Sequence, residues 1–220
     1  MTHPTFTAAD RLAAQAKRHS VRGKHEEAAR LQREAVDRCR TIYEASDDPA
    51  DTDDRERHEV AHRLADHYGR LGGIYRRAGQ LESALDSYTR GAELERDWLL
   101  DDSYNRTNRI TLSILVDPGR VPALAGEIAE TTELVRSQVD RTRRDQWWAW
   151  ADLGTLSLLD GRLRDALWAY DHFSGSGARR GDYESTLSVL RELTTAVSGV
   201  RPEHAWAFAA AIEHLEAARP

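Results

Sequence analysis

The sequence has few of the residues that build disulfide-linked, β-rich or membrane-spanning proteins. Cys39 is the only cysteine, which excludes a disulfide within the chain. Six prolines and three phenylalanines occur, and runs of β-branched residues are scarce. No stretch of about 18 apolar residues is present, and residues 1–17 lack the apolar segment of a secretion signal. These absences predict a cytoplasmic protein without a membrane span.

Basic residues are fewer than acidic ones, 31 against 37, which gives a formal net charge of -6 and a pI near 5.9. Acidic and basic residues alternate along most of the chain instead of forming a basic face, so we expect no nucleic-acid partner. A Gly-rich phosphate loop and a Gly-x-Ser-x-Gly elbow are both missing. These absences argue against the familiar enzyme classes that use such motifs, and we predict no enzymatic activity and no cofactor.

The residues that dominate are Ala, Leu, Arg and Glu, which are strong helix formers. Hydrophobic residues make up 40% and charged residues 31% of the chain, with a mean hydropathy of -0.67. This balance suits a helical protein with a large wetted surface. The composition therefore predicts an all-α fold.

Glycines recur at positions where one helix should end and the next begin. Successive intervals between them are 56, 40, 42 and 38 residues. Glycine ends a helix at little steric cost because it adopts the left-handed conformation readily. The five turn glycines are Gly23, Gly79, Gly119, Gly161 and Gly199. They predict five helix pairs at about 8–45, 55–100, 103–139, 144–173 and 183–218, with an acidic linker at 46–54.

Two of these pairs share a residue pattern that resembles the tetratricopeptide repeat. The clearer copy contains Tyr68, Leu71-Gly72, Tyr75, Ala84, Tyr88 and Gly91. The second copy contains Trp150, Leu153-Gly154, Ala166 and Tyr170, with Ser157 where the family has an aromatic residue. The resemblance implies a right-handed superhelical stack of antiparallel helix pairs, an α-solenoid, as a single domain over 1–220. It also implies a protein-binding scaffold, because such stacks present a concave groove to partners.

The first helix of the second pair should present a polar face to this groove. Its apolar stripe is Val60, Leu64, Tyr68, Leu71 and Tyr75, at helical spacing. The opposite face carries His58, His62, Asp66, Gly69, Gly73 and Arg76. The resemblance implies that this face lines the groove, where Gly69 and Gly73 would leave room for a ligand.

The third pair opens with a polar segment, residues 104–109, that should lie beside that face. Arg106 and Arg109 can hold a carboxylate or phosphate, and Asn105 can bond an extended peptide backbone. The alternative is a helix start whose side chains contact only solvent. In the fourth pair, Trp150 should pack in the core, whereas Trp148 should point to the groove or to a partner.

A different function is suggested by His58-Glu59-Val60-Ala61-His62, which has the His-Glu-x-x-His spacing of zinc proteases. Two histidines one turn apart can bind a metal, and a glutamate can activate water. A third ligand is missing, because this protease pattern needs a glycine and then a third histidine where Ala65 and Tyr68 stand. The candidates for weaker metal binding are His58, His62 and Asp66, and the simplest interpretation is an exposed polar helix face.

The favoured hypothesis is a scaffold that binds a peptide or helix of a partner, with acidic groups, in its groove. The groove candidates are His62, Asp66, Arg76, Asn105, Arg106, Arg109 and Trp148. The alternatives are a metal-binding protein or zinc-dependent hydrolase, and a self-associating module of a larger signalling complex. The oligomeric state stays open at this point.

Overall fold

The computed structural model describes residues 4–46 and 53–220, and these residues form helices joined by short turns without any strand. This confirms the predicted all-α fold. The contacts fall into two compact units, residues 1–112 and 113–220, and helix α5 (Tyr104–Val116) runs across their boundary. Most of the predicted acidic linker, residues 47–52, lies outside the described residues. The single domain over 1–220 stays a prediction.

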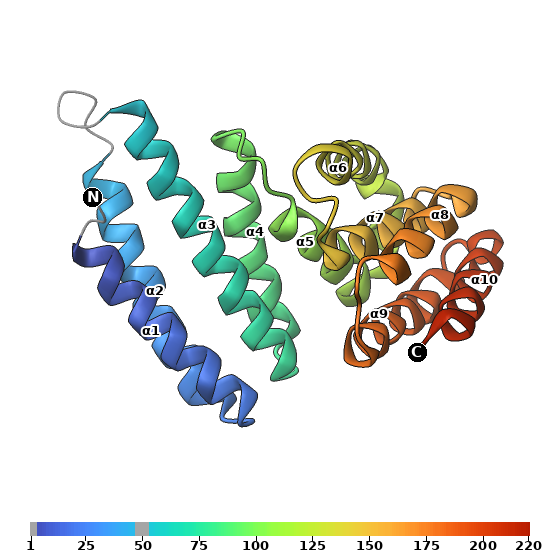
Figure 1. Ribbon diagram of the computed structural model, residues 1–220, viewed down its shortest axis with the longest axis horizontal. Helices are drawn as coiled ribbons and strands as arrows, with labels where there is room; N and C mark the ends of the chain where they lie inside the picture. The colour runs from blue at the N-terminus through green and yellow to red at the C-terminus, as the bar shows by residue number, and fades with distance from the viewer. Residues whose placement is uncertain (1–3, 47–52) are drawn as a thin grey trace. The chain divides into compact units, whose positions relative to one another are not determined.

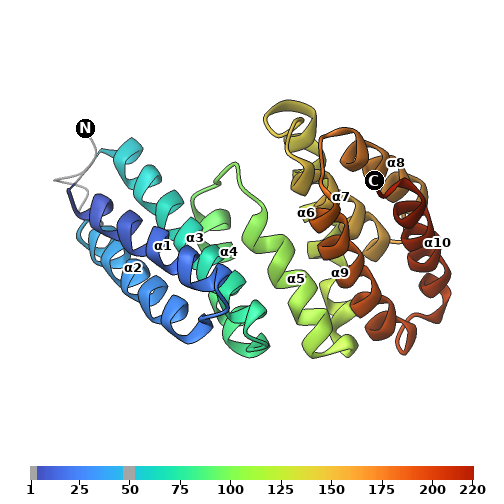
Figure 2. The same ribbon diagram turned by 60° about the horizontal axis from the view of Figure 1, so that its bottom comes forward.

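In the first unit, helices α1 to α4 pack against one another in chain order. Helix α1 contacts α2, α2 contacts α3, and α3 contacts α4, so α3 lies between α2 and α4 (Figure 1 and Figure 2). The helices are α1 (Pro4–Val21), α2 (His25–Ala45), α3 (Asp54–Arg77) and α4 (Leu81–Asp97), followed by the first part of α5. Their bounds agree with the first two predicted pairs.

Helix α3 shows why this unit folds as it does. Asp53 caps its start, where the carboxylate accepts a hydrogen bond from the backbone N–H of Arg55 at 3.3 Å. The predicted apolar stripe, Val60, Leu64, Tyr68, Leu71 and Tyr75, is buried along its whole length. Burying such a stripe supplies most of the stability of a helix that would be marginal alone.

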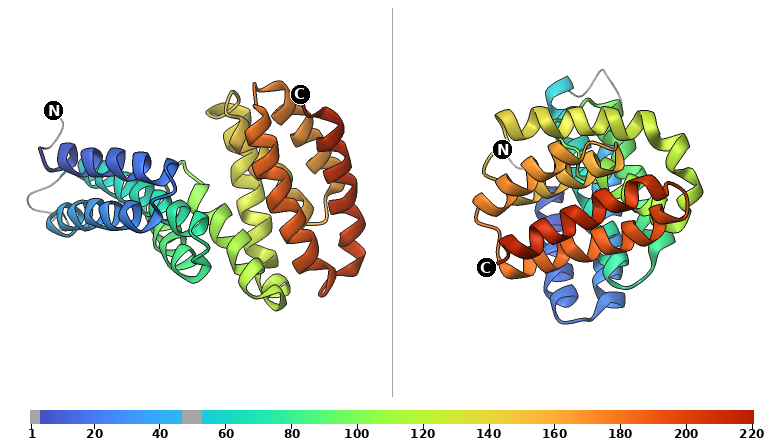
Figure 3. Two further views of the ribbon diagram at one scale, coloured as in Figure 1. Left: turned by 90° about the horizontal axis from the view of Figure 1, so that it is seen from below. Right: turned by 90° about the vertical axis from the view of Figure 1, so that its right-hand side faces the viewer.

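The second unit is built around an apolar helix, α7. Because α7 is apolar on all sides, it has to be covered from several directions, and it contacts α6, α8, α9 and α10. Figure 3 shows α9 and α10 running side by side in opposite directions. The elements are the 3-10 turn η1 (Pro118–Arg120), α6 (Val121–Arg141), α7 (Trp147–Leu159), α8 (Leu163–Gly175), α9 (Arg180–Ser198) and α10 (Pro202–Ala218). None of the described helices combines the length and apolarity needed to cross a bilayer.

The predicted turn glycines behave in two ways. Gly23, Gly79 and Gly161 have φ values of 73°, 73° and 77°, the left-handed conformation that was predicted for them. Gly119 lies in the 3-10 turn, and Gly199 has an ordinary φ of -78°. The prediction of a left-handed turn is therefore wrong for these last two, although a helix ends near each of them.

The two repeat copies contain the same packing contact. A methyl group added at Gly72 would lie 2.8 Å from the Tyr88 ring, and one added at Gly154 would lie 2.5 Å from the Tyr170 ring. In each pair, a glycine of the first helix thus receives a buried tyrosine of the second helix. Ala84 and Ala166 are also fully buried, as their places in the repeat pattern predict.

Candidate functional site

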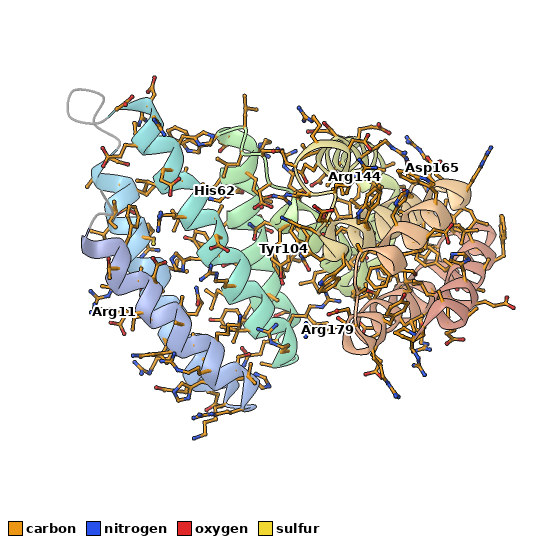
Figure 4. The ribbon with its side chains drawn as sticks, viewed as in Figure 1. Arg11, His62, Tyr104, Arg144, Asp165 and Arg179 are labelled. Carbon is orange, nitrogen blue, oxygen red and sulfur yellow. The ribbon has the colours of Figure 1, made fainter. Side chains whose placement is uncertain are left out.

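The predicted polar face of α3 is present only in part. His62, labelled in Figure 4, is exposed on α3, and Asp66 is exposed one turn further on. Asp66 is held in an ion pair with Arg70, at 2.6 Å. Arg76 is half-buried and donates to Asn108 Oδ1 at 3.4 Å. His62 and Asp66 therefore share a solvent-facing side, with the charge of Asp66 already paired.

The expected exposure of Asn105 is wrong, since its side chain is 2% exposed. Its amide nitrogen donates to Ala65 O at 3.1 Å and to Glu95 Oε1 at 2.7 Å. Methyl groups added at Gly69 and Gly91 would lie 2.9 Å and 2.4 Å from Asn105 atoms. The glycine at position 69 thus makes room for Asn105 and not for a ligand, and Gly73 is likewise buried.

Asn105 belongs to a buried polar cluster at the start of α5. Glu95, which is 0% exposed, accepts hydrogen bonds from the backbone N–H groups of Asn105 at 2.9 Å and Arg106 at 3.1 Å. Its carboxylate thereby caps the N-terminus of α5 from α4. The pKa of Glu95 is raised to about 7, chiefly by burial and also by the nearby Asp102, against three hydrogen bonds that lower it. Sequence reasoning missed this cluster because Glu95 follows no motif.

The remaining candidates are partly accessible. Arg106 and Arg109 are half-buried on α5, and both make interactions within the protein. Trp148 belongs to the second unit, is half-buried, and has the Arg143 guanidinium 4.8 Å above its ring. That these residues bind a partner stays a prediction.

In the His-Glu-x-x-His segment, the glutamate is used in an ion pair and both histidines face solvent. Glu59 is held by Arg63 at 2.7 Å, and His58 and His62 are both exposed. No group of three His, Cys, Asp or Glu side chains that could hold a metal occurs in residues 4–46 and 53–220. Cys39 is fully buried, and burial raises the pKa of its thiol to about 12, which suits an unreactive core thiol.

A buried histidine lies close to that segment but points inward. His67 is placed with Nδ1 3.1 Å from the Gln32 amide nitrogen and Nε2 3.8 Å from Asp10 Oδ1. Burial, followed by the charge of Arg70, lowers the pKa of His67 below its ordinary value. His67 is therefore a neutral core residue that is hydrogen-bonded to Gln32 of α2 and lies near Asp10 of α1.

The first unit contains a pocket of about 280 Å³ between α2 and α4, with α3 as its floor. Its floor carries two tyrosines of the buried stripe, and its walls carry three arginines. The lining residues are Arg33, Val36, Asp37, Arg40, Tyr68, Leu71, Tyr75, Ser83, Asp86, Ser87 and Arg90. We call this feature the α2–α4 pocket.

Each tyrosine hydroxyl of the α2–α4 pocket contacts an arginine from a flanking helix. Arg33 of α2 donates to the Tyr75 hydroxyl at 2.8 Å. Arg90 of α4 is paired with Asp86 at 3.0 Å and also hydrogen-bonds Tyr68, and both contacts raise the pKa of Arg90 above its ordinary value. The sequence placed both tyrosines on a buried stripe but gave no signal that α2 and α4 leave a gap above them.

An aromatic cluster marks the second unit. Trp150 is buried as predicted, with its ring stacked on His172 at a centroid distance of 4.4 Å. Trp168 lies edge-on to Trp150 at 5.3 Å and is 39% exposed. Arg136 lies 5.8 Å from the Trp168 ring and pairs with Asp165, which is labelled in Figure 4, at 2.8 Å. Part of the tryptophan cluster therefore reaches the surface through Trp168.

Among the comparisons with known proteins, the one with solved structures returned matches. The chain is similar to TPR-like helical-repeat proteins. Kinesin light chain-like repeats of Podosopora anserina align over 99% of this chain and 98% of theirs, with 19% identity and a TM-score of 0.43. BtubC (BKLC) from P. vanneervenii aligns over 97% of this chain and 90% of its own, with 15% identity and a TM-score of 0.43.

A third solved structure is the complex of the TPR2AB domain of yeast Sti1 with pHSP90. It aligns over 96% of this chain and 99% of its own, with 11% identity and a TM-score of 0.24. No family model matches the sequence, and no curated protein matches it significantly. At these identities and TM-scores, the likeness assigns no residue of this chain to a binding site.

Proposed function

We propose that this chain is a protein-interaction scaffold whose first unit binds a segment of a partner protein in the α2–α4 pocket. The observation that carries the proposal is the pocket itself, with an aromatic floor and a charged rim of Arg33, Arg40 and Arg90. Ligand sites combine apolar and aromatic walls with a few polar groups that fix orientation. A volume of about 280 Å³ suits one or two side chains of an extended segment.

The groove that the first helix of each pair was predicted to line remains a second contact surface in this proposal; we call it the first-helix groove. His62 and Asp66 are exposed on α3. The three arginines of this set are half-buried, Arg76 on α3 and Arg106 and Arg109 on α5. Asn105 is removed from this set because its amide is used inside the protein. An extended partner could contact either surface, so the experiment has to separate them.

Selection from a random peptide display library on the full-length protein tests the proposal. We expect wild-type protein to enrich peptides whose binding is lost in Arg33→Glu and kept in Arg38→Glu. Arg38 is the matched control because it lies on the same helix, pairs with Glu34 at 2.9 Å, and does not line the pocket. Circular dichroism should show that both variants keep the helical fold.

The double variant Arg106→Glu, Arg109→Glu reports on the other surface. Peptides lost in this variant but kept in Arg33→Glu would move the binding site to the predicted groove and contradict its placement in the pocket. Enrichment of no peptide by the wild-type protein would count against peptide binding as its function.

Self-association is a second candidate, favoured by Trp206, which is 64% exposed on the last helix. A large exposed aromatic residue is a common anchor of an interface. Light scattering on wild type and Trp206→Gln would decide it. A wild-type mass that stays that of a monomer at high concentration would reject self-association.

A further inference from the structure

Within the proposed function, the charges of the α2–α4 pocket identify the group that it binds. Its lining has three arginines and two aspartates. Asp37 is paired with Arg40 at 2.8 Å, and Asp86 with Arg90 at 3.0 Å. Arg33 forms no ion pair with any residue that the structure describes. The pocket therefore has one cation left over after both carboxylates are used.

The Tyr75 hydroxyl beside Arg33 is a further donor. The Tyr75 oxygen accepts from Arg33 Nη1 at 2.8 Å, so the tyrosine proton remains for another acceptor. Ser87 spends its hydroxyl proton on Ser83 O at 2.9 Å. A ligand that meets Arg33 and Tyr75 together must therefore offer acceptor oxygens, and preferably negative charge.

We propose that the α2–α4 pocket binds a carboxylate or phosphate group of the partner segment through Arg33, with the Tyr75 hydroxyl as second donor. A guanidinium holds either group with two parallel hydrogen bonds. Val36 and Leu71 in the lining would pack against the aliphatic part of the same side chain. Because the whole chain carries a net charge of -6, the attraction has to be local to this pocket.

The location distinguishes this site from the polar face expected on α3. The pocket uses Tyr68, Leu71 and Tyr75, which point between α2 and α4. His62 and Asp66 lie on a different side of the same helix and are exposed. At about 100° per residue, position 66 is roughly 160° around the helix from position 68. A ligand in the pocket therefore does not need the first-helix groove.

NMR titration of the full-length, 15N-labelled protein tests the site with three small probes. These are N-acetyl-O-phosphoserine methylamide, N-acetylglutamate methylamide and the neutral N-acetylglutamine methylamide. We expect an anionic probe to shift the Arg33 Nε–H resonance at millimolar concentration, and the neutral probe to leave it unchanged. The comparison of the two anionic probes decides between phosphate and carboxylate.

Variants then assign the effect to Arg33. Arg33→Gln should weaken binding of the anionic probe by about tenfold or more, whereas Arg38→Gln should not change it. Tyr75→Phe should weaken it by a few fold, because the charge is kept and one donor is lost. Arg33→Lys, which keeps the charge, should bind better than Arg33→Gln and serves as the check if the latter folds poorly.

The proposal is overturned if neither anionic probe shifts Arg33, or if Arg33→Gln binds as well as wild type. These outcomes are separate from the fate of the scaffold function. Peptides selected without any acidic or phosphorylated residue, yet lost on Tyr75→Ala, would leave the scaffold standing and remove the anion site. Probe binding without any selected peptide would keep the anion site and count against the scaffold function.

Discussion

At the scale of single residues, folding changes the protonation of Glu95 at mildly acidic pH. Its carboxyl is completely buried between α4 and the start of α5, and it accepts three N–H groups. Burial raises its pKa to about 7, so the folded protein holds a proton there that the unfolded chain releases near pH 4.5. Protonation of Glu95 and folding are therefore linked.

The sign of this linkage predicts how stability changes with pH. Between about pH 4.5 and pH 7 the native state binds more protons than the unfolded state, so the contribution of Glu95 to stability falls as the pH rises. Between pH 5.5 and pH 8 we expect a loss of roughly 2 kcal/mol from this group. Urea unfolding of wild type and Glu95→Gln at both pH values measures it, since the variant cannot ionise.

Comparison with the variant is needed because other groups titrate in the same range. His67 acts in the opposite direction, because its lowered pKa makes the folded protein more stable as pH rises toward 6.5. Glu93→Gln, an exposed glutamate on the same helix, is the matched control and should keep the wild-type dependence. An equal pH dependence in wild type and Glu95→Gln would contradict the prediction.

Asn105 shows where sequence reasoning fails at the scale of one residue. An asparagine in a polar run at a helix start predicts exposure, and Arg106 and Arg109 beside it are indeed partly exposed. The space that buries Asn105 comes from Gly69 and Gly91, which lie on two other helices. No local pattern reports that three distant positions meet, so the error concerns tertiary contacts and not helix propensity.

At the scale of elements, the C-terminal ends of α1, α3, α4 and α7 share one pattern of backbone hydrogen bonds. At Gly79, the backbone N–H donates to Arg76 O at 3.0 Å, and the next N–H donates to Tyr75 O at 2.9 Å. Leu99 occupies the equivalent place after α4, with bonds to Arg96 O at 3.2 Å and, from Leu100, to Glu95 O at 2.9 Å. Leu99 has φ 49°, a conformation that disfavours a residue with a Cβ.

Leu99→Gly should therefore stabilise the protein. The side chain of Leu99 is 86% exposed, so little buried surface is lost, and relief of the left-handed strain outweighs the extra entropy of glycine. We expect a gain of about 0.5–1 kcal/mol in the free energy of unfolding, measured by urea denaturation.

The reverse change at the same kind of position is the control. Gly79→Ala adds a methyl with nothing within 4 Å at φ 73°, so it should cost about 1 kcal/mol through the backbone alone. A loss of stability in Leu99→Gly would mean that the leucine side chain makes contacts in solution that outweigh its strain.

How far the sequence predicts the elements depends on the kind of signal. Glycine spacing located the helix boundaries well, and the stripe from Val60 to Tyr75 is buried as expected. Glycine identity did not determine the conformation, because Gly199 is right-handed while Leu99 is left-handed. The reason is that backbone hydrogen bonds of the whole turn set φ, and glycine only lowers the cost of one outcome.

At the scale of the whole molecule, the repeat pattern predicts which residues recur from pair to pair. It does not predict how the contacts divide the chain into two units. The Gly72–Tyr88 contact of the first copy recurs as the Gly154–Tyr170 contact of the second. The division into residues 1–112 and 113–220 falls inside α5, where no turn or composition change marks it. Likewise, the α2–α4 pocket depends on the distance between α2 and α4, and the spacing of apolar residues in the sequence does not predict that distance.

The same division predicts separable unfolding. Five of the six tryptophans lie in residues 113–220, so tryptophan fluorescence reports mainly on the second unit, whereas circular dichroism reports on both. Gly154→Ala places a methyl 2.5 Å from the Tyr170 ring and should destabilise the second unit by roughly 1–3 kcal/mol. We expect its fluorescence midpoint in urea to fall, with part of the circular dichroism change left at its wild-type position.

Gly72→Ala is the matched change in the first unit, where the added methyl would lie 2.8 Å from the Tyr88 ring. It should shift the circular dichroism transition and leave the fluorescence midpoint nearly unchanged, because Trp98 is the sole tryptophan of that unit. If instead both variants move both signals together, the chain unfolds as one cooperative body. In that case the continuous helix α5 couples the two cores strongly enough to make the single predicted domain the correct description.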